Sequence, residues 1–303
     1  MRGLFWCLVI ASIAACGGER IVASPHLEPK VTHQARSLQP GEVVGVTVQS
    51  PVALADAEAS IFGRIFPFYP ERNSLVWHGL IGIDLETKAG QYVAKIVATR
   101  VDGTTLRLDH KLTIRNKSFA TRFLKVKEKF VNPPPSVLAR IRRESKRVSA
   151  IFAAVGPQRL WEGAFRLPVP GAPTSGFGKR SVLNGKPRSP HSGTDFRAVS
   201  GTAVRAPNNG RVVLADHLYY SGNTIIIDHG LGLYSYLAHL SSFSVREHDK
   251  VQAGEVIGYV GATGRVTGPH LHWTVRLIEA RVDPESLIDV LSPGQVRRTT
   301  SRF

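Results

Sequence analysis

The feature that most constrains the fold is the repeated alternation of short apolar runs with turn residues. In the C-terminal half, three turn sequences each precede a run of apolar, largely β-forming residues: Asn208-Asn209-Gly210, Ser221-Gly222-Asn223 and Gly230-Leu231-Gly232. Turn residues between such runs are typical of antiparallel hairpins. From residue 157 onward, no long helix is expected before residues 283–290. We therefore expect residues 157–292 to form an antiparallel β domain, followed by a C-terminal tail at 293–303.

A second strand-rich stretch covers residues 40–115. Turn residues separate five candidate strands, at 43–48, 61–66, 75–83, 92–99 and 106–114. Several short strands at this spacing predict a small N-terminal domain that resembles a β-sandwich. The fold class expected for the whole chain is therefore mainly β.

The segment between these stretches, residues 116–156, is a basic linker. From 116 to 147 it has ten basic residues against two acidic ones, a net +8 that is half of the chain's +16. Ser136 is expected to cap a helix whose basic side chains lie opposite an apolar stripe. Six residues fit that stripe: Val137, Leu138, Ile141, Val148, Ile151 and Phe152. The basic face is either a solvated surface or a contact for anionic polymer or lipid headgroups.

The N-terminus has the features of an export signal. Arg2 precedes an apolar run at 4–11, and small residues lead to Cys16. The run is shorter than the roughly 20 apolar residues that a membrane span needs. Its end resembles a bacterial lipoprotein signal, which implies removal of residues 1–15, a lipid on Cys16 and a tether at 16–39. An ordinary signal peptide with a chance cysteine is the alternative.

Composition agrees with an exported globular protein. Hydrophobic residues make up 43% and charged residues 20%, which argues against wholesale disorder and against a polytopic membrane protein. Of the two cysteines, Cys7 lies within the signal, so no internal disulfide is expected. The charge of +16 favours polyanionic partners. Because the chain carries an export signal, we expect these to be envelope components and not nucleic acid.

Histidines gather in the C-terminal domain, where seven of the 11 lie between His191 and His272. His270 and His272 are two apart before a strand-like run, so they would project from one face. His191 and Asp195 are too far apart on a straight strand to share an ion, but a bend at Gly193 could bring them together. His191, Asp195 and one of the His270/His272 pair would then supply three zinc ligands, leaving the other histidine for proton transfer.

The order of three motifs strengthens this hypothesis. They are H-x-x-x-D at 191–195, Y-x-x-H-L-S at 236–241 and T-G-x-x-x-G-P-H-L-H at 263–272. Together they resemble the lysostaphin/LytM-type zinc endopeptidases over about residues 160–290. The resemblance implies zinc held by His191, Asp195 and His272, with His239 and His270 as the non-ligand catalytic pair. Trp273 stands where the family typically has Phe.

The same resemblance implies the chemistry. His239 would act as general base, and His270 would orient the water or stabilise the tetrahedral intermediate. Some members use a tyrosine ahead of the first ligand to steady the oxyanion. Residues 180–190 contain none, and although Arg188 lies nearby, the oxyanion-stabilising residue stays open.

Peptidoglycan peptide stems are the substrate that the resemblance implies, with D-alanine to diaminopimelate links in a Gram-negative wall. The expected location is the periplasmic side of the cell envelope, with the lipid on Cys16 inserted in the outer membrane. A catalytically silent wall-binding regulator and a polyanion-binding surface lipoprotein are the alternatives, although all five site positions are filled. We also expect the N-terminal domain to position or cover the active-site groove.

Overall fold

The computed structural model describes residues 28–292. The expected signal peptide, Cys16 as the expected site of the lipid, the first part of the expected tether and the C-terminal tail at 293–303 lie outside the described residues. Within residues 28–292, no helix is both long enough and apolar enough to cross a membrane. The described chain is mainly β, which confirms the expected fold class.

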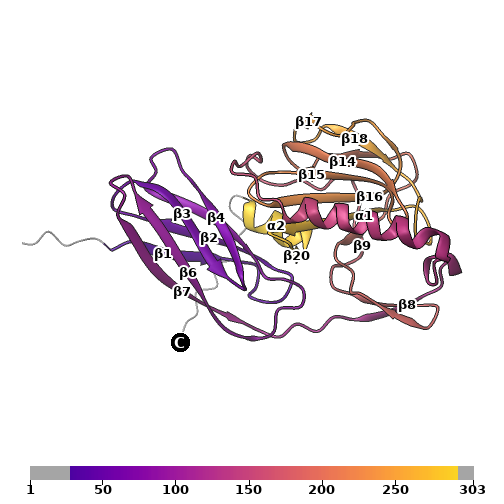
Figure 1. Ribbon diagram of the computed structural model, residues 1–303, viewed down its shortest axis with the longest axis horizontal. Helices are drawn as coiled ribbons and strands as arrows, with labels where there is room; N and C mark the ends of the chain where they lie inside the picture. Colours follow the sequence, from indigo (N-terminus) through magenta and orange to yellow (C-terminus); the bar gives the residue numbers. More distant parts are fainter. Residues whose placement is uncertain (1–27, 293–303) are drawn as a thin grey trace, which may run out of the picture.

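The N-terminal part, indigo to purple in Figure 1, is a seven-stranded antiparallel sheet. Its strand order is β1-β2-β5-β4-β3-β6-β7. Its strands are β1 (Lys30–Gln34), β2 (Val43–Gln49), β3 (Leu54–Ile61), β4 (Arg64–Pro70), β5 (Val76–Gly82), β6 (Gly90–Arg100) and β7 (Thr105–Ile114). The first half of β4 pairs with β3 and its second half pairs with β5, so β4 joins the two halves of the sheet.

Two local predictions in this part were wrong. The strand expected at 61–66 is a hairpin, because Phe62 and Gly63 both have positive φ, 55° and 71°, and form the two-residue turn between β3 and β4. The segment expected to be only a tether contains β1, which pairs with β2 along its whole length. Polar side chains dominate β1, so the sequence lacks the apolar alternation that would have revealed it.

The linker is more structured than its composition suggests. It contains β8 (Thr121–Leu124), a 3-10 turn (Glu128–Phe130) and the helix α1 (Pro135–Ala153). The helix begins with Pro135 in its first turn and has no side-chain cap, so the capping role expected of Ser136 was wrong. The C-terminal end of its apolar stripe packs on the C-terminal domain, where Phe152 contacts Tyr234 edge-on at a centroid distance of 5.7 Å.

The C-terminal part is built on a ten-stranded antiparallel sheet with the main order β17-β14-β15-β16-β19-β12-β9. Three further strands extend it: β13 pairs with β18, β18 with β16, and β20 with β19. The strands are β9 (Pro173–Ser175), β12 (Thr194–Phe196), β13 (Ala203–Arg205), β14 (Gly210–Leu218), β15 (Gly222–Asp228), β16 (Leu233–Phe243), β17 (Lys250–Val251), β18 (Val256–Val260), β19 (Leu271–Leu277) and β20 (Ala280–Val282).

A small sheet connects the linker to this domain. Here β8 pairs in parallel with β10 (Arg180–Leu183), which pairs with β11 (Lys186–Arg188). The chain ends its described part in the helix α2 (Pro284–Leu291), whose N-cap Asp283 accepts a hydrogen bond from Glu285 N–H. This helix lies where the sequence predicts one.

The N-terminal sheet packs against the side of the C-terminal domain that carries α2 and β20 (Figure 1). Val43 N–H donates to Ser286 Oγ over 2.9 Å, and Arg36 Nη2 lies 2.6 Å from Asp283 Oδ2. Arg281 of β20 forms a bidentate ion pair with Asp84, which follows β5. Buried apolar residues of both parts belong to one cluster, so the two parts share a continuous core.

Candidate metal centre

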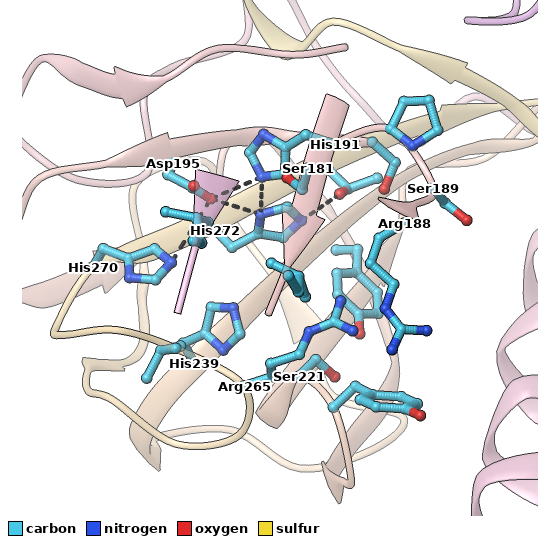
Figure 2. A pocket seen from close by; sticks show the side chains of 18 of the residues that line it. Ser181, Arg188, Ser189, His191, Asp195, Ser221, His239, Arg265, His270 and His272 are labelled. Carbon is cyan, nitrogen blue, oxygen red and sulfur yellow. Dashed lines mark hydrogen bonds and ion pairs between the residues drawn. The ribbon is translucent and has the colours of Figure 1, made fainter. Parts of the chain in front are cut away.

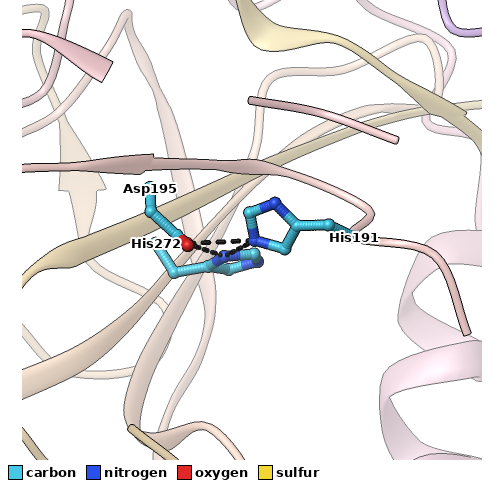
Figure 3. A group of neighbouring side chains, drawn as sticks. All are labelled: His191, Asp195 and His272. Carbon is cyan, nitrogen blue, oxygen red and sulfur yellow. Dashed lines mark hydrogen bonds and ion pairs between the residues drawn. The ribbon is translucent and has the colours of Figure 1, made fainter. Parts of the chain in front are cut away.

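Three predicted ligand side chains converge on one point (Figure 3). His191 Nε2 lies 3.0 Å from Asp195 Oδ1 and 3.0 Å from His272 Nδ1, and His272 Nδ1 lies 2.9 Å from Asp195 Oδ1. Among residues 28–292, this is the group of histidine, cysteine and acidic side chains that could hold a metal ion. The structure therefore brings together the three residues that the sequence proposed as ligands.

The hydrogen bonds around these rings fit a cation at that point. His191 Nδ1 faces the carbonyl oxygen of Gly176 at 3.2 Å, and because a carbonyl only accepts, Nδ1 carries the proton. His272 contacts the Thr274 hydroxyl through Nε2 at 2.8 Å, which leaves Nδ1 directed at the centre. Two imidazole lone pairs and a carboxylate oxygen then face one another, and this N₂O donor set suits zinc.

Strand pairing and one glycine create the convergence. Asp195 on β12 lies directly opposite His272 on β19 in the antiparallel ladder. His191 precedes β12, and the backbone between them passes close to β19 at Gly193. A Cβ atom on Gly193 would come within 2.4 Å of the Trp273 carbonyl oxygen, so the close approach requires glycine. The bend expected at Gly193 is thus where His191 turns toward Asp195.

Asp195 is held as a carboxylate. Burial alone would raise the pKa of Asp195, but the hydrogen bonds and charges of His191 and His272 outweigh it and hold the pKa well below its usual range. Arg122 adds a positive charge on the other side, with Nη1 3.6 Å from Asp195 Oδ2 and a hydrogen bond to Ser175 Oγ. Arg122 lies on β8, so the linker supplies a contact to the site.

His239 sits at an irregularity in β16. Its φ of 66° is in the left-handed region, and the pairing with β15 slips by one residue beside it. Such a bulge redirects a side chain, and a residue with positive φ at a site suggests a functional constraint. His239 Nδ1 donates to the Thr263 carbonyl oxygen over 2.9 Å, which leaves Nε2 as the nitrogen with a lone pair.

The environment keeps His239 neutral. Burial lowers the pKa of His239 to about 3, and the neighbouring His272 and His270 act in the same direction. A neutral imidazole with a fixed tautomer can accept a proton at Nε2. His270 lies beside it, with a ring-centroid distance of 4.9 Å. His270 Nδ1 donates to the Gly268 carbonyl oxygen over 2.9 Å, and its Nε2 lies 3.7 Å from Asp195 Oδ1.

All five predicted site residues line one cavity of 630 Å³ (Figure 2). The other walls come from the linker, from the segment 181–192, from the loop around Tyr220, from the segment 265–267 and from side chains of β16 and β19. None of the lining residues belongs to the N-terminal sheet. Of the two roles expected for the N-terminal domain, covering the groove is therefore wrong, because its docking face is the α2 and β20 side, and β8 and α1 wall the cavity instead. Positioning of the groove by this domain stays a prediction.

Several residues at the site carried no clear sequence signal. Gly176, Thr263 and Gly268 act through backbone carbonyls, which any residue type supplies. Thr274 could have been found, because it lies two residues after His272 and thus on the same face of the strand. His229, which belongs to none of the three motifs, is fully buried and bonds the Asn209 carbonyl oxygen and Ser235 Oγ.

Fold and site together define a mainly β metallopeptidase with a His-Asp-His metal centre. The family model described as Peptidase family M23 matches residues 189–284. A crystal structure of a Pseudomonas aeruginosa protein described as a peptidase M23 is 31% identical, covering 84% of this chain and 96% of that one, with a TM-score of 0.66. The chain belongs to peptidase family M23, and family membership implies a zinc cofactor.

Curated relatives match about a third of this chain. The DD-carboxypeptidase/endopeptidase Mpg of Neisseria meningitidis is 44% identical over 97 residues, 32% of this chain and 22% of that protein. The peptidoglycan DD-endopeptidase ShyA of Vibrio cholerae is 45% identical over 85 residues, 28% of this chain and 20% of that protein. The matched region thus spans about a fifth of the length of these relatives.

Proposed function

We propose that this protein is a zinc-dependent endopeptidase that hydrolyses peptide cross-links of bacterial peptidoglycan. One observation carries the proposal: His191, Asp195 and His272 converge within 3.0 Å of one another in a cavity that also contains His239 and His270. The names of the Neisseria and Vibrio relatives support the peptidoglycan substrate and the DD type of peptide bond.

His191, Asp195 and His272 would hold the ion. A bound zinc ion acts as a Lewis acid that polarises the scissile carbonyl and makes water a better nucleophile near neutral pH. His239 would accept the proton of the attacking water at Nε2 and return it to the leaving amine, a role worth about 10²- to 10⁴-fold in rate. His270 would orient the water or donate to the oxyanion of the tetrahedral intermediate.

The envelope is the location that this substrate requires. Residues 1–15 would act as a lipoprotein signal, and a lipid on Cys16 would anchor the protein on the periplasmic side of the outer membrane. The division into an N-terminal β domain, a basic linker and a metallopeptidase domain at 157–292 belongs to the same proposal. The net charge of +16 favours contact with anionic envelope polymers.

The test is mass spectrometry of purified sacculi after incubation with the zinc-loaded protein, with and without a zinc chelator. We expect chelator-sensitive release of muropeptides whose cross-links are cut. His239→Ala should keep its zinc, measured by elemental analysis, and lose at least about 100-fold of the rate, because the base is removed while the ligands remain. Exposed His217→Ala is the matched control and should retain full activity.

Two outcomes would contradict the proposal. Full activity of the zinc-loaded His239→Ala variant would remove His239 from the mechanism. A folded, zinc-loaded protein that releases no products would favour the wall-binding regulator. If such a protein bound sacculi in a salt-sensitive, metal-independent way, a polyanion-binding surface lipoprotein would be the favoured function.

A further inference from the structure

Arginines dominate the charge of the cavity that holds the metal centre. Four of them line it, against a single acidic residue, Asp195. Two have partners that explain their positions: Arg122 pairs with Asp195, and Arg276 lies over the Phe152 ring with its guanidinium carbon 5.2 Å from the centroid. Arg188 and Arg265 remain, and Figure 2 shows both directed into the cavity.

Arg265 is held firmly without an acidic partner. Its backbone N–H donates to the Tyr220 carbonyl oxygen over 2.7 Å, and its guanidinium carbon lies 4.9 Å from the centroid of the Tyr220 ring. The preceding Gly264 has a φ of 78° and packs on the backbone of 220–222, which fixes the loop. No acidic side chain of the described residues lies within ion-pair distance of Arg265.

Arg188 comes from the opposite wall, at the end of β11. Its Nη2 donates to the Val131 carbonyl oxygen, which ties it to the linker. Its Nε is buried and has no hydrogen-bond partner among the described residues. No acidic group within residues 28–292 forms an ion pair with it either.

Two partly buried guanidinium groups of like charge in one cavity are unfavourable by themselves. Removing a charge from water costs several kcal/mol unless an opposite charge or hydrogen bonds compensate. The proximity of Arg188 contributes to a lowered pKa of Arg265, after the larger effect of burial. A bound zinc ion would add more positive charge to the same cavity. An anion bound near both guanidinium groups would compensate this charge.

We propose that Arg188 and Arg265 bind a free carboxylate of the substrate peptide and so select acidic over amidated stems. The inference rests on the proposed function and names the substrate class of that same site. Guanidinium groups suit the task, because their planar donors match the two oxygens of a carboxylate and stay charged at all relevant pH values. Arg188 and Arg265 are thus specificity-determining residues.

The experiment compares two synthetic cross-linked peptide dimers, one with free carboxylates and the same dimer with those carboxylates amidated. Kinetics and calorimetric binding are measured with the zinc-loaded full protein. The wild type should prefer the free acid by about 10- to 100-fold in kcat/KM, mainly through KM, since hydrogen bonds to charged groups contribute on that scale. Arg265→Gln and Arg188→Gln should each remove most of this preference.

Controls separate recognition from folding. Arg265→Lys keeps the positive charge but loses the planar pair of N–H donors, so it should retain part of the preference for the free acid. Arg246→Gln removes an exposed charge of the same domain, with a side chain 91% exposed, and should behave as the wild type. Melting temperatures should stay within a few degrees in all variants, because none of these substitutions removes a partner from a buried ion pair.

Each outcome decides one question. Equal turnover of the acid and the amide by the wild type overturns the inference. So does a loss in Arg265→Gln that is equal for both dimers and confined to kcat, because that result assigns the arginines to the oxyanion. Tighter, arginine-dependent binding of the acid without turnover of either dimer would sustain the inference and refute the proposed endopeptidase.

Discussion

At the scale of single residues, Thr274 determines how His272 presents its nitrogen to the metal. The Thr274 hydroxyl lies 2.8 Å from His272 Nε2 and is buried, with 3% of the residue exposed. Thr274→Val should weaken zinc binding by about 10- to 100-fold, because the ring loses the contact that fixes its tautomer and orientation. Competition with a chromogenic chelator measures the affinity.

The conservative variant Thr274→Ser keeps the hydroxyl and should bind zinc nearly as well as the wild type. If Thr274→Val and Thr274→Ser lost affinity equally, the effect would come from packing and not from the hydrogen bond. A wild-type affinity in Thr274→Val would show that strand pairing alone orients His272.

Residue spacing pointed to His191, Asp195 and the His270/His272 pair, and the family resemblance added His239. All five line one cavity, because the fold places them at fixed points on neighbouring strands. The i, i+2 relation of His270 and His272 follows from strand periodicity, and both line the cavity. Spacing could not find Arg122, which reaches Asp195 from a segment far upstream. Its basic neighbours made it look like part of a solvated surface.

At the scale of elements, β8 couples the linker to the metal centre. Because β8 pairs with β10, the Arg122 side chain reaches Ser175, Ser181 and the Oδ2 of Asp195. Arg122→Gln should lower the zinc affinity by on the order of tenfold, since the ligand carboxylate loses the charge that supports it. The chelator competition assay measures this change as well.

Lys125→Gln is the matched control for that variant. Lys125 follows β8, is exposed and also carries one positive charge, so its loss should leave zinc binding unchanged. Equal effects of Arg122→Gln and Lys125→Gln would mean that only the general field of the basic linker matters.

The strands were predicted correctly where the apolar runs and the turn residues indicated the same strand bounds, and wrongly where they did not. The strands at 43–49 and 105–114 have apolar positions that are buried in the core. The hairpin at Phe62-Gly63 was missed because Phe62 is not a typical turn residue and made 61–66 look like one apolar run. The bulge at His239 has no sequence signature, since it depends on how β16 pairs with both neighbours.

At the scale of the whole molecule, the two β parts behave as one body. Glycines permit the close packing: a Cβ atom on Gly82 would come within 2.9 Å of the Ala280 Cβ, and one on Gly45 within 3.0 Å of Val290 Cγ1. No periodicity in the sequence predicts which faces meet, because both partners in a docking interface resemble ordinary strand residues. Deletion of the N-terminal sheet would expose this shared core.

The ion pair across that interface predicts how stability depends on pH. Burial alone would raise the pKa of Asp84, but hydrogen bonds from the Arg281 side chain and backbone outweigh it and lower the pKa to about 2. A carboxyl whose pKa is lower in the folded state stabilises that state above its unfolded pKa of about 3.9. This contribution, about 2 kcal/mol, should disappear as the pH falls from about 4 to about 2.

Chemical denaturation of the wild type and of Asp84→Asn at several pH values between about 2 and about 7 measures the contribution of Asp84 to the free energy of unfolding. The variant should be less stable at pH 7, since Arg281 is then without its buried partner, and its stability should fall less steeply below pH 4. Exposed Asp56→Asn should follow the wild-type curve. Parallel curves for the wild type and Asp84→Asn would mean that the apolar core alone joins the two parts.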